Sequence, residues 1–430
     1  MDFESIASAI PPPGPTSDQH ITPPTGSPAE RWARLGTDSA IVLHAVEVRL
    51  VELELIAPVR TSRGEHRRRP VVLVRLSGTD RGTPVGGWGE CAALADRTYE
   101  AEDVDGSFSV LESVLGPALV STCSTDGRLP PPAALGALRW RAPDAPLAFA
   151  ALEMAVADLH LRSMATSFAD WLGVGPDPVP AGAVVGECRD PAELLGRVDA
   201  LVDQGYGRIK MKIGRGADLE PIAAVRQAHP GLFLQADANE DYTESDIDHL
   251  VGLDRYDLAC LEQPFRRDDL AAHARLAQRS STPVCLDESL DSPESVVRAL
   301  EMGACSVVCL KPARLGGIGH ALEVVRLCSA SSVPLWLGGM FETGFARAVN
   351  VVVGAASGTD WPGDLSPATS YLRHDLTVPG SPEVDPAGPP RVVPSRAPGM
   401  GPGFDPAAVD RHTVRRVHLE TGPGPGFGHG

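Results

Sequence analysis

Five charged residues recur at a nearly fixed interval in the second half of the chain. Lys212 is followed by Asp237, Glu262, Asp287 and Lys311, at separations of 25, 25, 25 and 24 residues. Three carboxylates form an oxygen-rich site of the kind that Mg²⁺ or Mn²⁺ prefers in proteins. A cation there can stabilise the charge that develops when a proton is removed beside a carboxylate, and a lysine can accept that proton. The spacing therefore predicts a divalent-cation site flanked by two lysines.

Each of the five residues closes a short apolar run, which is typical of a strand buried on both faces. The runs are 208–212, 232–237, 258–262, 284–287 and 307–311. The intervening segments, such as 218–229 and 293–302, can form helices, and a strand, a crossover helix and the next parallel strand need about this much chain. Charge at the ends of buried strands is typical of the active face of a β/α barrel.

The same interval extends the pattern in both directions. One step back reaches the run 179–186, and two steps forward reach 334–339 and 361–364. These runs bring the number of strand candidates to eight, which is the number that closes a parallel barrel. We therefore predict an α/β fold, in which residues 176–372 form a TIM-like (β/α)7β barrel with its chemistry on one rim.

Residues 41–175 precede the barrel and have a different pattern. The predicted elements are strands at 46–55, 70–76 and 86–91, with a polar turn at 61–65, and a helix at 146–162. Alternating apolar residues around a polar turn indicate a β-hairpin. We expect a separate α+β capping domain whose loops cover the barrel mouth.

The two ends of the chain are rich in proline and glycine. Residues 1–40 have the composition of a disordered leader and lack the basic start and apolar centre of a secretory signal. Within residues 373–430, the run 414–419 predicts a last strand that returns to the capping domain, before a Gly/Pro-rich tail.

The overall composition favours some classes of protein over others. The chain is 43% hydrophobic and 22% charged, and it has no apolar run near membrane-spanning length. Its net charge of −18 argues against nucleic acid or an anionic membrane as the main partner. The eight cysteines form no CxxC pair, which predicts reduced thiols in a cytoplasmic protein.

Short motifs around the charged residues stand in a recognisable order. They are Lys210-Met-Lys212, Asp237-Ala-Asn239, Leu261-Glu-Gln-Pro264, Asp287-Glu-Ser289, Leu310-Lys-Pro312 and Gly338-Gly-Met-Phe-Glu-Thr-Gly344, with Gly87-Trp-Gly-Glu-Cys91 and Thr98-Tyr-Glu100 in the first domain. In this order the chain resembles the enolase superfamily, and within it the o-succinylbenzoate synthase and N-succinylamino acid racemase family. The resemblance covers about residues 41–375.

The resemblance implies a role for each matching residue, beside the interpretation that each residue allows by itself. It implies Lys212 and Lys311 as the catalytic lysines and Asp237, Glu262 and Asp287 as ligands of Mg²⁺, with Mn²⁺ as an alternative. A single carboxylate at a strand end is otherwise a helix cap or a salt-bridge partner. Lys210 is expected either to support Lys212 or to lie exposed on the rim, and Asn239 and Glu288 either to support the site or to form turns. The predicted substrate contacts are Gly339, Met340, Glu342, Arg63 and Tyr99.

Three functions follow, each acting on a small-molecule carboxylate. The first is o-succinylbenzoate synthase, a dehydration in menaquinone biosynthesis in which Lys212 removes the α proton and Lys311 contributes charge. The second is N-succinylamino acid racemase, in which both lysines transfer protons on opposite faces. The third is a non-catalytic barrel that binds a carboxylate. We also expect a homo-oligomer. Two departures from the family concern the substrate, namely the lid turn 59–63, which lacks phenylalanine, and Val184 in place of a hydroxyl residue.

Overall fold

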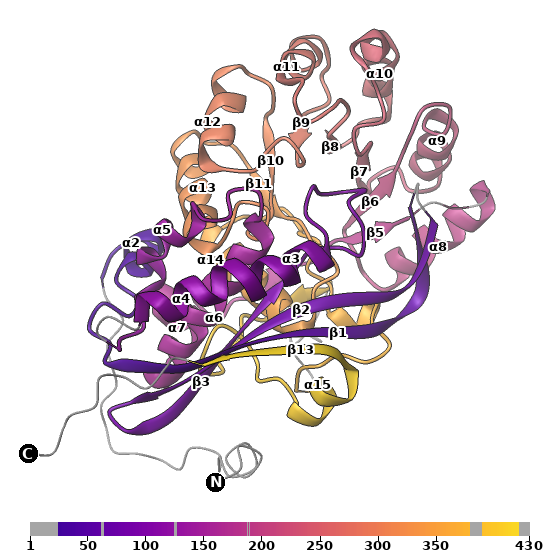
Figure 1. Cartoon of the computed structure of the whole chain (residues 1–430). Coiled ribbons are helices and arrows are strands. Elements are labelled where there is room, and N and C mark those ends of the chain that lie inside the picture. Colours follow the sequence, from indigo (N-terminus) through magenta and orange to yellow (C-terminus); the bar gives the residue numbers. More distant parts are fainter. Residues whose placement is uncertain are drawn as a thin grey trace, which may run out of the picture.

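Two sheets organise the chain in the computed structural model, which describes residues 25–61, 64–123, 127–186, 188, 190–378 and 389–420. One sheet is antiparallel and belongs to the capping domain, and the other is parallel and forms the barrel. Figure 1 shows the barrel strands, surrounded by their helices, above the long antiparallel ribbon. In the described part of the chain, no helix is both long and apolar enough to cross a membrane.

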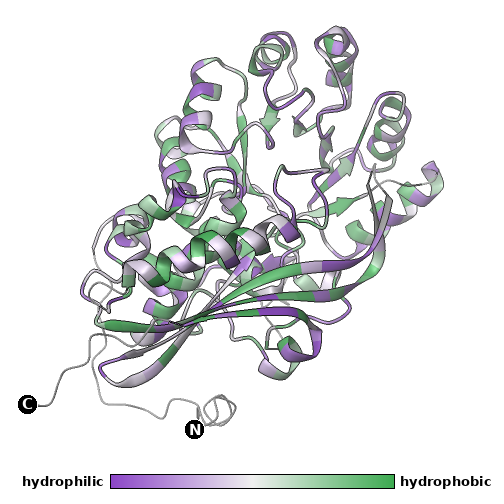
Figure 2. Ribbon diagram, in the orientation of Figure 1, coloured by the Kyte–Doolittle hydropathy of each residue, from purple (hydrophilic) through white to green (hydrophobic). Residues whose placement is uncertain are grey.

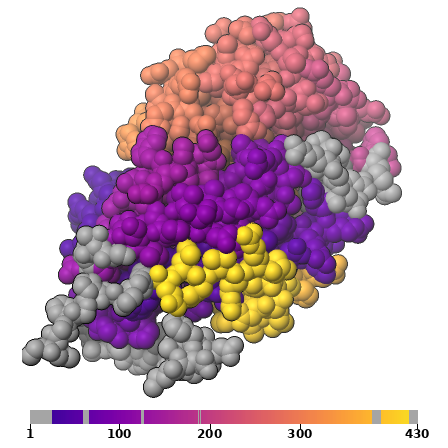
Figure 3. Space-filling model, in the orientation of Figure 1, coloured from indigo at the N-terminus to yellow at the C-terminus, as the bar shows by residue number. Residues whose placement is uncertain are grey.

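The antiparallel sheet has the strand order β13-β1-β2-β3. Its strands are β1 (Ile41–Thr61), β2 (Gly64–Asp80), β3 (Thr83–Cys91) and β13 (Thr413–Glu420). The predicted hairpin is present as β1 and β2, and the C-terminal strand β13 pairs with β1. In Figure 3 the C-terminal segment, coloured yellow, lies on the outside of the capping domain.

The main helices of the cap pack on this sheet. They are α3 (Val104–Val110), α4 (Gly116–Cys123), which continues α3 through a π-helical turn at Leu111–Leu115, and α6 (Pro146–Ser163). Helix α6 is buried on nearly all sides, since it lies between the sheet and the barrel. A side chain at Gly87 or Gly89 of β3 would overlap the α6 backbone at Ala155 or Ala151. Glycine therefore permits the close contact between β3 and α6.

The parallel sheet contains seven strands in sequence order. They are β5 (Ala183–Val185), β6 (Arg208–Lys212), β7 (Phe233–Asp237), β8 (Cys260–Glu262), β9 (Val284–Leu286), β10 (Val307–Leu310) and β11 (Leu335–Leu337). The helices between and after them are α8 (Pro191–Asp203), α9 (Leu219–Ala228), α10 (Ile247–Val251), α11 (Leu270–Arg279), α12 (Pro293–Glu301), α13 (Ile318–Ala330) and α14 (Gly344–Ser357). This order confirms the predicted α/β barrel with a capping domain.

The eighth strand candidate, 361–364, closes the ring without forming a regular strand. The Gly363 carbonyl accepts a hydrogen bond of 2.7 Å from the Gly182 amide at the start of the sheet. The Asp364 amide donates a bond of 2.7 Å to the Leu337 carbonyl at the end of β11. The Gly363 amide also donates a 3.2 Å bond to the Pro180 carbonyl. The segment therefore joins the two ends of the sheet through a few hydrogen bonds and forms no regular strand, because its Trp-Pro-Gly sequence does not favour regular pairing.

Strand β2 is buried on both faces, which explains its continuous apolar run. Val71 and Leu73 pack with the barrel core, while Val72 and Val74 pack with the core of the cap. Hydrophobic residues run along β1 and β2 in Figure 2. The antiparallel sheet is thus a shared layer between the two cores.

The prediction that residues 1–40 form a disordered leader is wrong for residues 25–40. Helix α2 (Pro28–Ala33) begins at a capping box formed by Ser27 and Glu30. Trp32 and Leu35 are buried, and the Trp32 ring packs edge-on against Phe168 at 5.9 Å. Two large apolar side chains thus order a segment whose average composition is polar. Residues 1–24 and 421–430 lie outside the described residues, and the predicted domain boundaries stay predictions.

Candidate active site

The five charged residues lie at the carboxyl ends of adjacent strands. Lys212, Asp237 and Glu262 are the last residues of β6, β7 and β8 and are paired in register. Asp287 and Lys311 directly follow β9 and β10. The carboxyl ends of parallel strands meet at one edge, so the three carboxylates lie between the two lysines on one rim. All three carboxylates are buried.

Lys212 is held at the rim by two oxygen atoms. Its Nζ lies 2.7 Å from Asp237 Oδ2 and 2.5 Å from Asn239 Oδ1. Asn239 has a positive φ, which asparagine adopts more readily than most residues. Its amide nitrogen Nδ2 also donates a 2.9 Å hydrogen bond to Glu288 Oε1. Asn239 therefore forms part of the turn after β7. It also links Lys212 to Glu288 in the loop after β9.

Lys210 points into the barrel and is buried, so it does not lie exposed on the rim. Its Nζ lies 3.2 Å from Asp237 Oδ2, 3.2 Å from Glu262 Oε2 and 3.1 Å from Asp364 Oδ2. Burial acts to lower the pKa of Lys210, but the carboxylates of Asp364 and Glu262 outweigh it and the pKa is raised well above its usual value. Lys210 is therefore a fixed positive charge beneath the rim.

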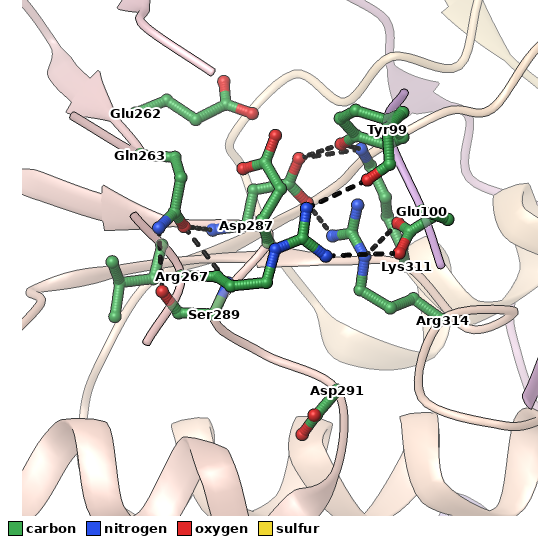
Figure 4. Close-up of polar contacts among 12 residues, drawn as sticks. Tyr99, Glu100, Glu262, Gln263, Arg267, Asp287, Ser289, Asp291, Lys311 and Arg314 are labelled. Atoms are coloured by element: carbon green, nitrogen blue, oxygen red, sulfur yellow. Dashed lines mark hydrogen bonds and ion pairs between the residues drawn. The ribbon is translucent and has the colours of Figure 1, made fainter. Parts of the chain in front are cut away.

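Lys311 belongs to a dense set of charges around Asp287 (Figure 4). Asp287 Oδ2 lies 2.8 Å from Lys311 Nζ and also accepts a hydrogen bond from the Tyr99 hydroxyl, while Asp287 Oδ1 accepts one from Arg314 Nη1. Burial acts to raise the pKa of Asp287, but Arg314 and Lys311 hold it well below its usual range. Burial acts to lower the pKa of Lys311, but Asp287 outweighs it and the pKa is raised.

The donor set at the rim fits a divalent cation. Glu262 and Asp287 offer carboxylate oxygens that lie, with the Cys309 sulfur, within 4.8 Å of one another. Burial, followed by repulsion from Asp237, raises the pKa of Glu262 to about 8. Such crowded buried anions favour a doubly charged counter-ion with oxygen ligands. Asp237 Oδ2 lies 2.7 Å from Lys212 Nζ and 3.2 Å from Lys210 Nζ.

The predicted substrate contacts occupy different places. Tyr99 lies at the rim beside Lys311, and Met340 and Glu342 line a small cavity together with Lys311. Gly339 lies on the seventh strand end, where a side chain would press on Arg347. Glu342 is buried, 2.8 Å from Arg347 Nη2 and 3.0 Å from Asn350 Nδ2. Its carboxylate is thus engaged inside the protein, and Arg63 lies outside the described residues.

Sequence reasoning missed four side chains in and beneath this rim. They are Glu100, Cys309, Arg314 and Asp364. Glu100 belongs to the motif Thr98-Tyr-Glu100, and Arg314 lies two residues beyond the motif Leu310-Lys-Pro312. This proximity was the only local signal for either residue. Cys309 is one of the eight cysteines predicted to be reduced thiols. Their partners lie on distant parts of the chain, which no local pattern identifies.

The three lysines of the chain predict selective chemical labelling. Lys210, Lys212 and Lys311 are its only lysines, and their side chains are 5%, 32% and 6% exposed. An amine-acylating reagent at low molar ratio should therefore label Lys212 before either other lysine. Peptide mass spectrometry would locate the label, with Lys212→Arg as the control. Earlier labelling of Lys311 or Lys210 would contradict the exposure of Lys212.

The sequence matches a known family over half its length. Residues 193–408 match the family described as "Enolase C-terminal domain-like". The chain is 39% identical to an N-succinylamino acid racemase of Amycolatopsis sp. over 380 residues, covering 88% of this chain and 99% of that protein. It is 36% identical to an o-succinylbenzoate synthase of Geobacillus stearothermophilus over 375 residues, covering 87% and 96%.

Solved structures resemble this chain over most of its length. A member of the enolase superfamily from Listeria innocua superimposes with a TM-score of 0.81 at 29% identity, covering 89% of this chain and all of that one. A probable mandelate racemase from Alicyclobacillus acidocaldarius superimposes with a TM-score of 0.80 at 32% identity, covering 88% and 99%. The likeness includes both the cap and the barrel, since it extends over most of each chain.

Proposed function

Because the chain belongs to the enolase superfamily, we propose that it removes the proton beside a substrate carboxylate, with Lys212 as the base. The observation that carries this proposal is the placement of Lys212 and Lys311 on opposite flanks of three buried carboxylates. Lys212 is the only lysine whose side chain is substantially exposed, so a substrate entering the barrel mouth can reach its Nζ. Enzymes of this superfamily bind a divalent cation and use a lysine or histidine base.

We propose o-succinylbenzoate synthase as the activity. In this reaction Lys212 Nζ takes the α proton of a cyclohexadiene carboxylate, the carbon–hydrogen electron pair moves towards the carboxylate, and hydroxide then leaves as the ring becomes aromatic. Lys311, held at Asp287, places positive charge against the developing anion. A divalent cation held by Asp237, Glu262 and Asp287 would supply further positive charge against the substrate carboxylate.

N-Succinylamino acid racemase is the second candidate. The specific observation in its favour is the second lysine on the opposite flank, together with the relative at 39% identity that bears this name. Here Lys212 takes the α proton from one face, and Lys311 returns a proton to the other face. The two reactions use the same side chains, so one protein can perform both.

A direct assay decides between the candidates. The purified protein should be incubated with Mg²⁺ and either the cyclohexadiene carboxylate or single enantiomers of N-succinylamino acids. Loss of diene absorbance measures the dehydration, and optical rotation measures racemisation. We expect dehydration to be the faster reaction. Turnover of neither substrate by folded, metal-loaded protein would favour the non-catalytic carboxylate-binding barrel.

A further inference from the structure

The cap contributes two adjacent side chains, Tyr99 and Glu100, to the rim of the barrel (Figure 4). They lie in the segment between β3 and α3. The Tyr99 hydroxyl donates a hydrogen bond to Asp287 and accepts one from Lys311. The Lys311 Nζ also lies 4.6 Å from the centre of the Tyr99 ring. The cap therefore contacts one of the two catalytic lysines directly.

Glu100 lies between two arginines that come from different barrel loops. Its Oε1 accepts a 2.6 Å hydrogen bond from Arg314 Nε, and its Oε2 lies 3.7 Å from Arg267 Nη1. Arg267 also donates a 3.0 Å hydrogen bond to the Tyr99 carbonyl. Glu100 is thus the cap carboxylate that ties the loops after β8 and β10 together.

Arg314 depends on this carboxylate because its side chain is only 3% exposed. Its Nε donates to Glu100 and its Nη1 to Asp287, while its Nη2 has no hydrogen-bond partner among the described residues. A buried guanidinium group is costly unless its donors are paired. Loss of the Glu100 charge would leave Asp287 as the main anionic partner of Arg314, so the guanidinium would move relative to Asp287.

A movement of Arg314 would reach Lys311 more directly than Lys212. Asp287 binds Arg314 through Oδ1 and Lys311 through Oδ2, so these two cations share one carboxylate. Lys212 is held by Asp237 and Asn239. In the described part of the chain neither partner contacts the cap, and the route from Glu100 to Lys212 runs through the 3.7 Å contact with Arg267, then Glu240 and the backbone to Asn239. The pairing of Lys212 therefore depends on the cap much less directly than that of Lys311.

We propose that Glu100 is a positioning residue through which the cap fixes Arg314 and, by way of Asp287, the catalytic Lys311. The set Tyr99, Glu100, Arg267 and Arg314 is called the cap latch. The inference rests on the proposed function in that it gives Lys311 a part in the reaction. It adds that the cap acts more directly on the position of Lys311 than on that of Lys212.

The three lysines allow the latch to be tested without any substrate. Full-length protein labelled with ¹³C at the lysine ε-carbon gives three side-chain signals, assigned by replacing each lysine with arginine. At fixed pH, Glu100→Gln should move the Lys311 signal and leave the Lys212 signal in place. The matched control is Glu102→Gln, because this carboxylate is also buried but accepts hydrogen bonds only within the cap, from Ser107, Leu147 and Ala148. The control should move neither signal.

Isotope exchange provides the catalytic readout. In deuterium oxide each enantiomer of an N-succinylamino acid exchanges its α proton through one lysine, and Lys311→Ala identifies the enantiomer that Lys311 serves. Glu100→Gln should slow that exchange about tenfold or more, since small displacements of a reacting group are costly. Exchange of the other enantiomer should stay within about twofold. In an Arg314→Met background, Glu100→Gln should have no further effect if it acts through Arg314.

The possible outcomes separate the latch from the proposed function. A Lys311 signal that stays in place in Glu100→Gln, or that moves no further than the Lys212 signal, would refute the proposed role of Glu100. If the Lys311 signal moves further than the Lys212 signal but the unmodified protein exchanges neither enantiomer, the latch stands and the proposed racemisation fails. If Glu100→Gln does not fold, Glu100→Asp can be used instead. It keeps the charge but shortens the side chain by one methylene, so the carboxylate lies further from Arg314. A Lys311 signal unchanged in Glu100→Asp would then overturn the latch.

Discussion

Removal of divalent cations from the purified protein is expected to abolish proton abstraction and to leave the fold intact. The loss should be about 10³-fold or more, because the charge that develops on the substrate would lose its main electrostatic partner. The fold should persist because each strand of the barrel packs its apolar side chains into a continuous core. Activity after chelation, its recovery with Mg²⁺ or Mn²⁺, and circular dichroism throughout would test this. Full activity of a rigorously metal-free preparation would refute the proposed metal site.

Substitution of single proposed ligands should reproduce part of this effect. Asp237→Asn and Asp287→Asn each remove an anionic oxygen, so each should lower the affinity for Mg²⁺, as measured by calorimetry. Asp287→Asn should also destabilise the protein, because Asp287 neutralises Lys311 and Arg314 in a buried setting. Asp364→Asn is the matched control, since Asp364 pairs with Arg208 and Lys210 below the rim. An equal loss of Mg²⁺ affinity in this control would argue against assignment of the ligands to the strand ends.

The sequence predicted the barrel and the positions of the charged residues well because both are local in origin. An apolar run that ends in a charge identifies a strand end, and three of the five residues indeed end strands while Asp287 and Lys311 follow theirs by one position. The constant interval then places the strand ends on one rim, since each unit contains one strand and one crossover helix. The cap hairpin was predictable for the same reason.

Contacts between distant segments were not predictable in this way. Glu100 and Arg314 are 214 positions apart in sequence, yet they form a 2.6 Å hydrogen bond. Glu342 belongs to a recognised motif, but its carboxylate turns to Arg347 on helix α14. Helix α2 was missed because the partner of Trp32, Phe168, lies far along the chain. In each case the decisive energy comes from burial or charge pairing with a residue that the local sequence does not specify.

Replacement of Lys212 and of Lys311 is expected to separate the two candidate reactions. Lys212→Ala should abolish both, since general base catalysis alone is worth about 10²–10⁴ in rate. Lys311→Ala should abolish racemisation, yet Lys212 should still exchange the α proton of one enantiomer in deuterium oxide. Lys311→Arg keeps the positive charge but is a poor base, so it should retain part of the dehydration and fail to racemise. Both reactions and α-proton exchange should be followed in all three variants.

The structure makes Lys311→Arg an informative substitution. Lys311 is buried against Asp287 and Tyr99, and a guanidinium group can form hydrogen bonds with the same oxygen atoms. The variant should therefore keep the charge balance around Asp287, and a change in racemisation would report proton transfer and not a loss of fold. Thermal unfolding of the variant provides the control for folding. Equal racemisation by Lys311→Arg and the unmodified protein would mean that Lys311 is not the second base, and that its role is confined to the positive charge that dehydration requires.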